Sequence, residues 1–300
     1  MIKFSEMRKT QIDLSIVTPN PKSISKLAIR ALLYEVSVNP KPGLVDPTSN
    51  KTHPDMDVFT FIDSSIILED YFDSCVEIAL KNKNASPVEL FQLIRHKGIK
   101  AEREMFTTTN GVNTHKGAIF SLGIMCTATA ICLQKENNLH LSEIQQTIKA
   151  MLVDLLNNDL NSAVLNDKSL TEGEKQYIKF GKTGIRGEAS NGFPAVFELS
   201  LPFFINSIGT LNERLIDTLI LIAGSIQDSN LIKRSDDIEI TNWMHLQMIE
   251  FQSLGGSKTQ EGMVFLKQLI VKFNQRNLSL GGSADTLILT IFLALLFNQI

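Results

Sequence analysis

Apolar residues recur at intervals of three and four positions along most of this 300-residue chain, and no other feature constrains the fold as strongly. Residues spaced in this way share one face of an α-helix. No segment shows convincing alternation of apolar and polar residues between hairpin turns, and no strand–helix–strand rhythm appears. The pattern therefore predicts an all-α protein. It is clearest in the first periodic segment, at Ile24, Leu27, Ala28, Ala31, Leu32 and Val36.

Helix-start signals locate the expected helices. Ser23 or Ser25 can cap the first one, a long helix is expected from about Asp57, and Ser86 followed by Pro87 opens another. We expect further helices near 115–135, 141–157, 172–181, 193–206, 210–227, 240–253, 257–275 and 283–298. No repeat or low-complexity linker divides the chain. The sequence predicts an N-terminal extension over residues 1–22 and a single multi-helix globular domain over residues 23–300.

Two apolar runs, residues 117–133 and 286–297, are shorter than the roughly 20 residues that a membrane span needs. The first is rich in glycine, alanine and serine, which let neighbouring helices approach closely. We expect both runs to form buried central helices. The N-terminus has no continuous apolar segment of the secretory kind, so a cytoplasmic protein without a membrane partner is expected.

Composition excludes some classes of partner. The net charge is −3 and the pI about 6.0, so no basic stripe indicates nucleic acid or an anionic membrane. Cys75, Cys126 and Cys132 form no CxxC pair, and two of them lie in apolar helical runs. We expect them to be buried, reduced thiols.

Polar residues gather at the breaks between the expected helices, where ligand-binding groups are common. In "EVSVNPKPGLVD" two prolines flank Lys41 and hold the chain off the helical path. A tight turn gains little from a lysine there, so Lys41 is a candidate ligand. In "THPDMD", His53, Asp55 and Asp57 alternate just before a helix. They either cap that helix or form a metal or phosphate site, and carboxylate oxygens suit Mg²⁺.

Two further polar segments follow. In "GVNTHKGA", His115 and Lys116 occupy a first helical turn, where a cation is unfavourable unless an anion binds there too or both side chains point to solvent. In "GKTGIRGEASNGFP" the Gly-Lys-Thr is not a phosphate-binding P-loop, because Gln176 stands where that motif requires glycine. A glycine-rich turn presenting Arg186 and Glu188 remains, and we favour a site over a plain loop.

The last polar segments lie near the C-terminus. In "QDSNLIKRSDD", Asp228, Asn230 and Arg234 surround a helix junction, and Asp228 is either a cap or a ligand. The phrases "GGSK" at 255–258 and "GGSAD" at 281–285 each open a helix. They serve either as caps or as a nest of backbone N–H groups for phosphate, and Asp285 adds a carboxylate.

Taken in order, six segments resemble the triphosphoribosyl-dephospho-CoA synthase family: "ALLYEVSVNPKPGLVD", "HPDMDVFTFIDSS", "NTHKGAIFSLG", "LTEGEKQYIKFGKTGIRGEASNGFP", "DSNLIKR" and "GGSADTLILTIFL". The resemblance runs from about residue 25 to 298. Each motif is weak alone, whereas six in the same order are highly specific. The chain departs from the family at Lys51 and Thr52, where small residues are usual, and at Ser229, where threonine is usual. None of these changes removes a charged group.

The resemblance implies that the protein is an enzyme converting ATP and 3′-dephospho-CoA into 2′-(5″-triphosphoribosyl)-3′-dephospho-CoA and adenine, with Mg²⁺. The product would pass to a transferase acting on the acyl carrier protein of citrate lyase. Breaking the N-glycosidic bond of ATP gives an oxocarbenium-like transition state, as in glycoside hydrolysis. A carboxylate would stabilise it, another would accept the 2′-hydroxyl proton, and basic groups would hold the triphosphate.

On this resemblance each polar residue receives a hypothetical role. Glu188 is the candidate base or cation stabiliser, with Asp57 and Asp228 as the other catalytic candidates, and exchanging Glu188 with Asp57 would be no surprise. Asp55, Asp57 and Asp228 are the expected Mg²⁺ ligands. Asp46, His53 and Asp285 are second-rank candidates. The expected substrate and phosphate contacts are Lys41, His115, Lys116, Arg186, Arg234, Asn39, Asn113, Gly187, Asn230 and Ser283.

Three alternatives stay open at this stage. The product could serve malonate decarboxylase instead of citrate lyase. A Mg²⁺-dependent nucleotide N-glycohydrolase would use similar groups with water as acceptor. A non-catalytic nucleotide sensor would keep Lys41 and Arg186 but has no need for so many carboxylates. The sequence does not give the oligomeric state, a homo-oligomer included, or the residues that select dephospho-CoA over CoA.

Overall fold

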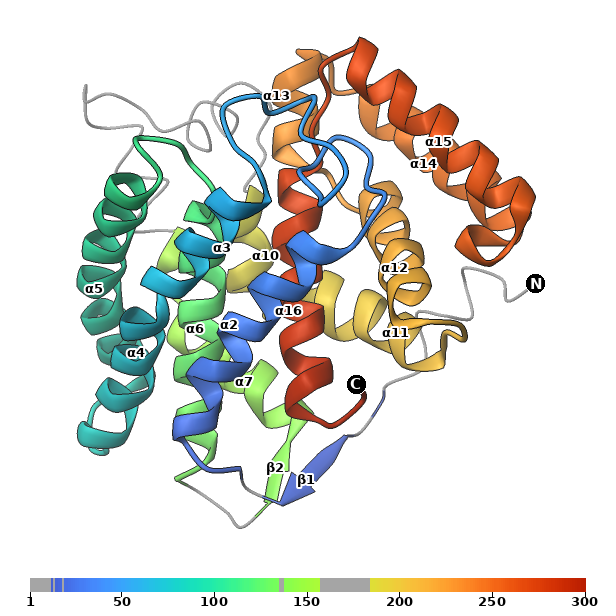
Figure 1. Ribbon diagram of the computed structural model, residues 1–300. Coiled ribbons are helices and arrows are strands. Elements are labelled where there is room, and N and C mark those ends of the chain that lie inside the picture. Colours follow the sequence, from blue (N-terminus) through green and yellow to red (C-terminus); the bar gives the residue numbers. More distant parts are fainter. Residues whose placement is uncertain (1–11, 13, 18, 135–137, 157–183) are drawn as a thin grey trace.

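Helix α16 (Gly281–Leu296) runs through the middle of the molecule (Figure 1). The computed structural model describes residues 12, 14–17, 19–134, 138–156 and 184–300. Every residue from Thr286 to Phe297 is buried, because α16 packs on helices from both halves of the chain. Its neighbours include α2 (Lys22–Ser37), α6 (Lys116–Cys132) and α12 (Leu211–Ser225). The predicted buried central helices are confirmed.

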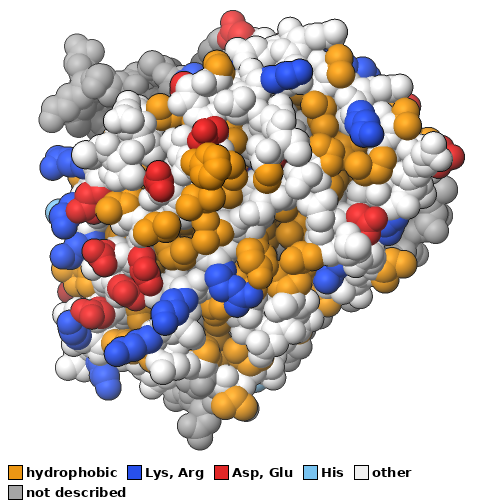
Figure 2. Space-filling view, in the orientation of Figure 1, with side chains coloured by type: hydrophobic (Ala, Val, Ile, Leu, Met, Phe, Trp, Pro, Cys, Tyr) orange, Lys and Arg blue, Asp and Glu red, His pale blue; other side chains and the backbone are white. Residues whose placement is uncertain are grey.

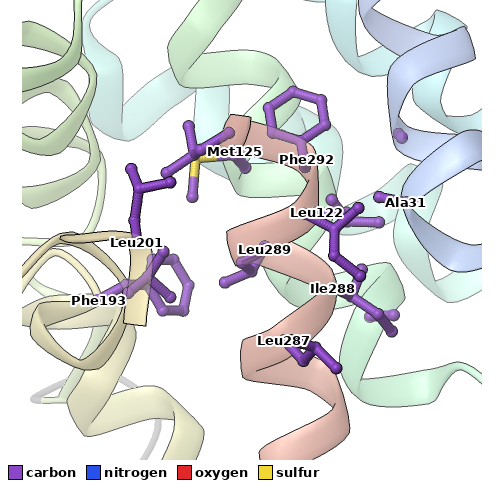
Figure 3. Packing of buried hydrophobic residues seen from close by; sticks show 14 of the residues in the cluster. Ala31, Leu122, Met125, Phe193, Leu201, Leu287, Ile288, Leu289 and Phe292 are labelled. Atoms are coloured by element: carbon purple, nitrogen blue, oxygen red, sulfur yellow. The ribbon is translucent and has the colours of Figure 1, made fainter. Parts of the chain in front are cut away.

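Apolar side chains from distant segments surround α16. In Figure 3, Phe193 and Leu201 lie on one side of the helix, and Ala31 of α2 and Leu122 of α6 lie on the other. The small residues of α6 permit the close packing expected of them. A Cβ atom at Gly123 would lie 2.1 Å from the hydroxyl oxygen of Tyr71, so only glycine lets α4 (Glu69–Lys81) come this near.

The long helix predicted from Asp57 is two helices, and this correction affects the site. Helix α3 (Val58–Ile67) ends at Leu68, which is buried, and α4 starts at the next residue. The break lets α4 bury its apolar face against α6 while α3 turns Ser64 and Ser65 inward. The predicted start is right, since Asp57 and Thr60 form a capping box.

The remaining helices follow the predicted order. Ser86 and Glu89 form the capping box of α5, as expected from Ser86 and Pro87. Two seven-residue helices, α10 and α13, were not predicted because so short a helix shows no periodicity. The predicted helix 172–181 lies outside the described residues. The bounds are α5 (Pro87–Thr108), α7 (Leu141–Met151), α10 (Gly184–Ser190), the π-helix η1 (Ala195–Ser200), α11 (Leu201–Asn206), α13 (Ser229–Ser235), α14 (Ile240–Ser253), the 3₁₀-helix η2 (Gly256–Lys258) and α15 (Gln260–Gln275).

One short ribbon accompanies the helices. Strands β1 (Ser15–Val17) and β2 (Asn138–His140) pair antiparallel, with Ile16 opposite Leu139. Three-residue strands are too short for alternation to be visible in a sequence. The all-α prediction is confirmed, because helices supply most of the described core residues and the ribbon is the only sheet among the described residues. Strand β1 ties part of the segment 1–22 to the domain, and the domain boundary at residue 22 stays a prediction.

The described residues contain no single helix that is both apolar and long enough to cross a membrane; the bent pair of α12 and α13 meets the length and composition criteria only when taken together. Cys75, Cys126 and Cys132 are buried free thiols, as expected. On the face shown in Figure 2, acidic and basic side chains are mixed over the edge formed by α4 and α5.

Candidate functional site

A cavity of about 150 Å³ lies where α6 and α16 begin. Five of the six motif segments contribute to its wall, and the described residues 184–194 of the sixth segment do not. Sites for drug-sized ligands are usually larger, so the cavity fits one part of a nucleotide rather than the whole. Its main polar lining residues are Glu35, His53, Asn113, His115, Lys116, Asn230 and Asp285.

Glu35, which lines the cavity, forms a buried ion pair with Lys41. The Nζ atom of Lys41 lies 2.6 Å from Oε1 of Glu35 and donates a second hydrogen bond to the Glu35 carbonyl at 2.7 Å. The two side chains are 0% and 4% exposed. Asp46 accepts a hydrogen bond from the Lys41 backbone N–H and two from Thr48, so it organises this loop. The Lys41 ammonium group therefore faces Glu35.

His115 is buried and has one unsatisfied ring nitrogen. Its Nδ1 atom lies 2.8 Å from Oγ of Ser64, and the Phe61 ring packs edge-on against the imidazole at 5.1 Å. Its Nε2 atom has no hydrogen-bond partner among the described residues. Burial, aided by the charge of Lys41, lowers the pKa of His115 to about 3, so the ring is neutral. A buried, unpaired polar atom in a cavity wall indicates a ligand-binding group.

Asp285 supplies a carboxyl group that is protonated at neutral pH. Burial, followed by the charges of Asp228 and Glu35, raises the pKa of Asp285 to about 8. Gly117 of α6 makes room for this carboxyl group, because a Cβ atom there would lie 1.9 Å from Oδ2 of Asp285. The cavity thus combines an acid with a neutral imidazole.

Asp228, in contrast, is fully occupied as a structural cap. Its Oδ1 atom accepts hydrogen bonds from the N–H groups of Asn230, Leu231 and Gly282, and its Oδ2 atom accepts two from Ser283. Burial raises the pKa of Asp228, while these hydrogen bonds oppose the rise. Asp228 therefore joins the start of α13 to the start of α16. Ser283 is part of this junction, because it donates two of the hydrogen bonds.

We expect Asp228→Asn to lower the free energy of unfolding by about 2–4 kcal/mol, because an amide has one acceptor oxygen and its NH₂ group would face N–H donors. Urea unfolding measures the loss. Asp57→Asn is the matched control, since asparagine caps a helix as well as aspartate and should cost little. Loss of activity at unchanged stability in Asp228→Asn would instead support the metal-ligand role.

The predicted Mg²⁺ ligands are not brought together. Asp55 and Asp57 are exposed, and Oδ1 of Asp57 accepts hydrogen bonds from Thr60, which lower the pKa of Asp57. Both oxygens of Asp228 are occupied, as described above. Within the described part of the chain, no three His, Cys, Asp or Glu side chains are placed to hold a metal ion. These residues do not fit a preformed protein cage for Mg²⁺.

Glu188, Arg186 and Gly187 lie on α10, which packs against α7 and does not line the cavity. Oε2 of Glu188 accepts a hydrogen bond from the Ala195 N–H at 3.2 Å. Burial, with the nearby charge of Glu198, raises the pKa of Glu188, and the Ala195 hydrogen bond opposes this. The preceding part of the motif, up to residue 183, lies outside the described residues. The predicted roles of Glu188 and Arg186 stay predictions.

The other predicted contacts fall into two groups. Asn113, Lys116, His53 and Asn230 line the cavity. Lys116 also pairs with Glu102, and its backbone N–H donates to Oδ1 of Asn113 at 3.2 Å.

The other two predicted contacts, Asn39 and Arg234, are not among the residues that line the cavity. Asn39 exchanges two hydrogen bonds with Asn212. Arg234 donates to Oδ1 of Asn277 at 2.8 Å. His53, which lines the cavity, also contacts Thr52 and Ser279 through its two ring nitrogens, and burial is the largest cause of its lowered pKa.

Sequence reasoning missed Glu35 and Ser64. For Glu35 a signal was present, because it continues the buried stripe of Ala28, Ala31 and Leu32 at helical spacing, where an acid is out of place. Ser64 gave no such signal, since a serine on a helix face is ordinary.

Comparison with known proteins gives a consistent result. A protein-family model described as ATP:dephospho-CoA triphosphoribosyl transferase matches residues 21–300. Protein CitXG of Leuconostoc mesenteroides subsp. cremoris is 50% identical over 275 residues, covering 91% of this chain and 59% of that longer protein. The probable 2-(5''-triphosphoribosyl)-3'-dephosphocoenzyme-A synthase of Lactiplantibacillus plantarum is 47% identical over 275 residues, covering 91% and 97%. No solved structure matches the chain.

Proposed function

The chain belongs to the ATP:dephospho-CoA triphosphoribosyl transferase family, and on this premise we propose that the transfer takes place in the cavity where α6 and α16 begin. The enzyme forms 2′-(5″-triphosphoribosyl)-3′-dephospho-CoA from ATP and 3′-dephospho-CoA. Because the transferred group is the ribose of ATP with its triphosphate, adenine is the leaving group. One observation carries the proposal: the unpaired Nε2 atom of His115 and the protonated carboxyl group of Asp285 line the same small cavity.

Asp285 suits both proton transfers of this reaction. The bond between C1″ and adenine breaks, the bond from C1″ to the 2′-oxygen of dephospho-CoA forms, and the 2′-hydroxyl proton is released. Asp285 gives its proton to the departing adenine, which makes adenine a better leaving group. The resulting carboxylate stabilises the positive charge on the ribose and then accepts the 2′-hydroxyl proton. The carboxyl group is thereby regenerated.

The triphosphate would lie toward the exposed edge of the cavity, because the exposed cations are there. Lys116 lines the cavity with about half of its side chain exposed, and Arg234 is close enough to His53 to lower the pKa of that histidine. We propose that Mg²⁺ enters with the triphosphate and neutralises part of its charge, since this ion commonly keeps its waters and takes oxygens from phosphates. No described residue is assigned to the ion.

The resemblance in sequence indicates which later reaction uses the product. We propose that a transferase attaches it to the acyl carrier subunit of citrate lyase, with the malonate decarboxylase counterpart as the alternative. Both substrates are ordinary cytoplasmic metabolites, which supports a cytoplasmic location.

Chromatography of the purified protein with ATP and Mg²⁺, with and without 3′-dephospho-CoA, tests the reaction. We expect free adenine only when dephospho-CoA is present, in equal amount to a heavier CoA-derived product, and little of either after Mg²⁺ is chelated. Adenine without dephospho-CoA would indicate an N-glycohydrolase. ADP in place of adenine would mean that a phosphoanhydride bond is broken, and the proposal would be wrong.

A further inference from the structure

A short chain of hydroxyl groups leads to the buried imidazole. Oγ of Ser64 lies 2.8 Å from Nδ1 of His115 and 2.6 Å from Oγ1 of Thr114. Ser64 is fully buried on α3, and Phe61, on the preceding turn of the same helix, packs edge-on against the imidazole. Helix α3 thus fixes both the direction and the hydrogen bonding of the His115 ring.

This contact can set the position of the imidazole proton. If the Ser64 hydroxyl accepts a hydrogen bond from Thr114 and donates to Nδ1, the ring proton must sit on Nε2. The reverse order of donors would leave Nε2 as an acceptor. The charge of Lys41 and the burial of the ring disfavour proton uptake by His115, so the imidazole is a poor base. The nucleotide offers acceptors to this wall of the cavity, namely the nitrogens of adenine and the oxygens of ribose and phosphate.

We infer that Ser64 is a positioning residue that holds His115 as a neutral hydrogen-bond donor, with its Nε2–H directed at the bound nucleotide. The inference rests on the proposed function of the cavity. A neutral imidazole that donates to a substrate can polarise it without becoming charged, which suits a buried site. In metal sites, removing a group that orients a ligating histidine through its second nitrogen changes affinity or activity by about 10–100-fold, and we expect an effect of that order here.

The first test is independent of activity. Nitrogen-15 NMR of the histidine-labelled, unmodified protein at neutral pH reports which ring nitrogen of His115 carries the proton, and His115→Gln identifies its signals. We expect a protonated Nε2 and an unprotonated Nδ1. In Ser64→Ala the two tautomers should mix. A protonated Nδ1 in the unmodified protein would overturn the inference.

Turnover provides the second test. Ser64→Ala should lower kcat by about 10–100-fold with a small change in KM for ATP. Ser65→Ala is the matched control, because Ser65 is equally buried on the next position of α3 but bonds only the Phe61 carbonyl. His115→Gln keeps an N–H donor at the same distance along the side chain, so it should retain more activity than His115→Ala.

The outcomes separate the inference from the proposed function. If His115→Ala is inactive while Ser64→Ala matches the unmodified enzyme, the positioning role of Ser64 is wrong. If His115→Gln is as slow as His115→Ala, the donor role of His115 is wrong. In both cases the cavity remains the site. If His115→Ala and Asp285→Asn both keep full turnover, the cavity is not where the transfer occurs.

Discussion

Asp285→Asn is expected to lower kcat by about 10²–10⁴-fold, the usual range for loss of a general acid–base group. Asparagine has nearly the same shape and can still hydrogen-bond adenine, but it gives up no proton and leaves no carboxylate beside the ribose. KM for ATP should change little, because the amide fills the same space beside Gly117. Release of adenine and formation of the CoA-derived product are both measured. Turnover like that of the unmodified enzyme would exclude Asp285 as the acid.

The same substitution should stabilise the protein, which separates a functional role from a structural one. The pKa of Asp285 is about 8 in the folded protein and close to 3.8 in the unfolded chain. Between these values the unfolded chain has lost the proton that the folded protein keeps, so stability falls as pH rises through this window. Asp285→Asn removes that fall, and each kcal/mol gained should raise Tm by about 2–4 °C.

Thermal unfolding at several pH values from about 4 to about 9 checks this. Asp63→Asn, at an exposed position of α3, is the control and should leave the pH dependence unchanged. A lower Tm for Asp285→Asn near neutral pH would mean that the carboxyl group is ionised and paired.

Breaking the ion pair between Glu35 and Lys41 should have the largest effect on stability. Glu35→Met leaves the Lys41 ammonium buried without a counter-ion, and Lys41→Met does the same to the Glu35 carboxylate. Each single substitution should lower the free energy of unfolding by about 3–5 kcal/mol. The double variant, which buries two apolar side chains of similar size, should recover most of this loss. Urea unfolding of the four proteins gives the coupling energy. Additive losses would mean that the two groups act independently.

The double variant also decides the role that the sequence suggested for Lys41. If the lysine serves only the loop and the Glu35 pair, KM for ATP should change little once stability is restored. A rise of about tenfold or more would show that the Glu35–Lys41 pair contributes to ATP binding, and a similar rise in Lys41→Met but not in Glu35→Met would assign the contact to Lys41.

The sequence by itself determined most of the secondary structure and most of the segments that line the cavity. Helical spacing and caps are local, because residues three or four positions apart meet within one helix whatever surrounds it. Asp57 and Ser86 therefore marked real helix starts. Five of the six ordered motifs contribute described residues to the cavity wall, because a ligand site collects polar residues at helix ends.

Only the tertiary structure decided what each polar residue does. Asp228 and Asp285 look alike in the sequence, as carboxylates at helix starts. Folding brings Asp228 against the N–H groups of Gly282 and Ser283, more than 50 residues away, and satisfies it with five hydrogen bonds. Asp285 meets the bare backbone of Gly117 instead and keeps its proton.

The same holds for Lys41, Glu35 and Ser64. The burial of each group, its ionisation and its hydrogen-bond partners depend on segments that lie far from it in the chain. A local pattern of residue types carries no information about such long-range contacts, so the sequence proposed a set of candidate groups and the fold assigned their chemistry.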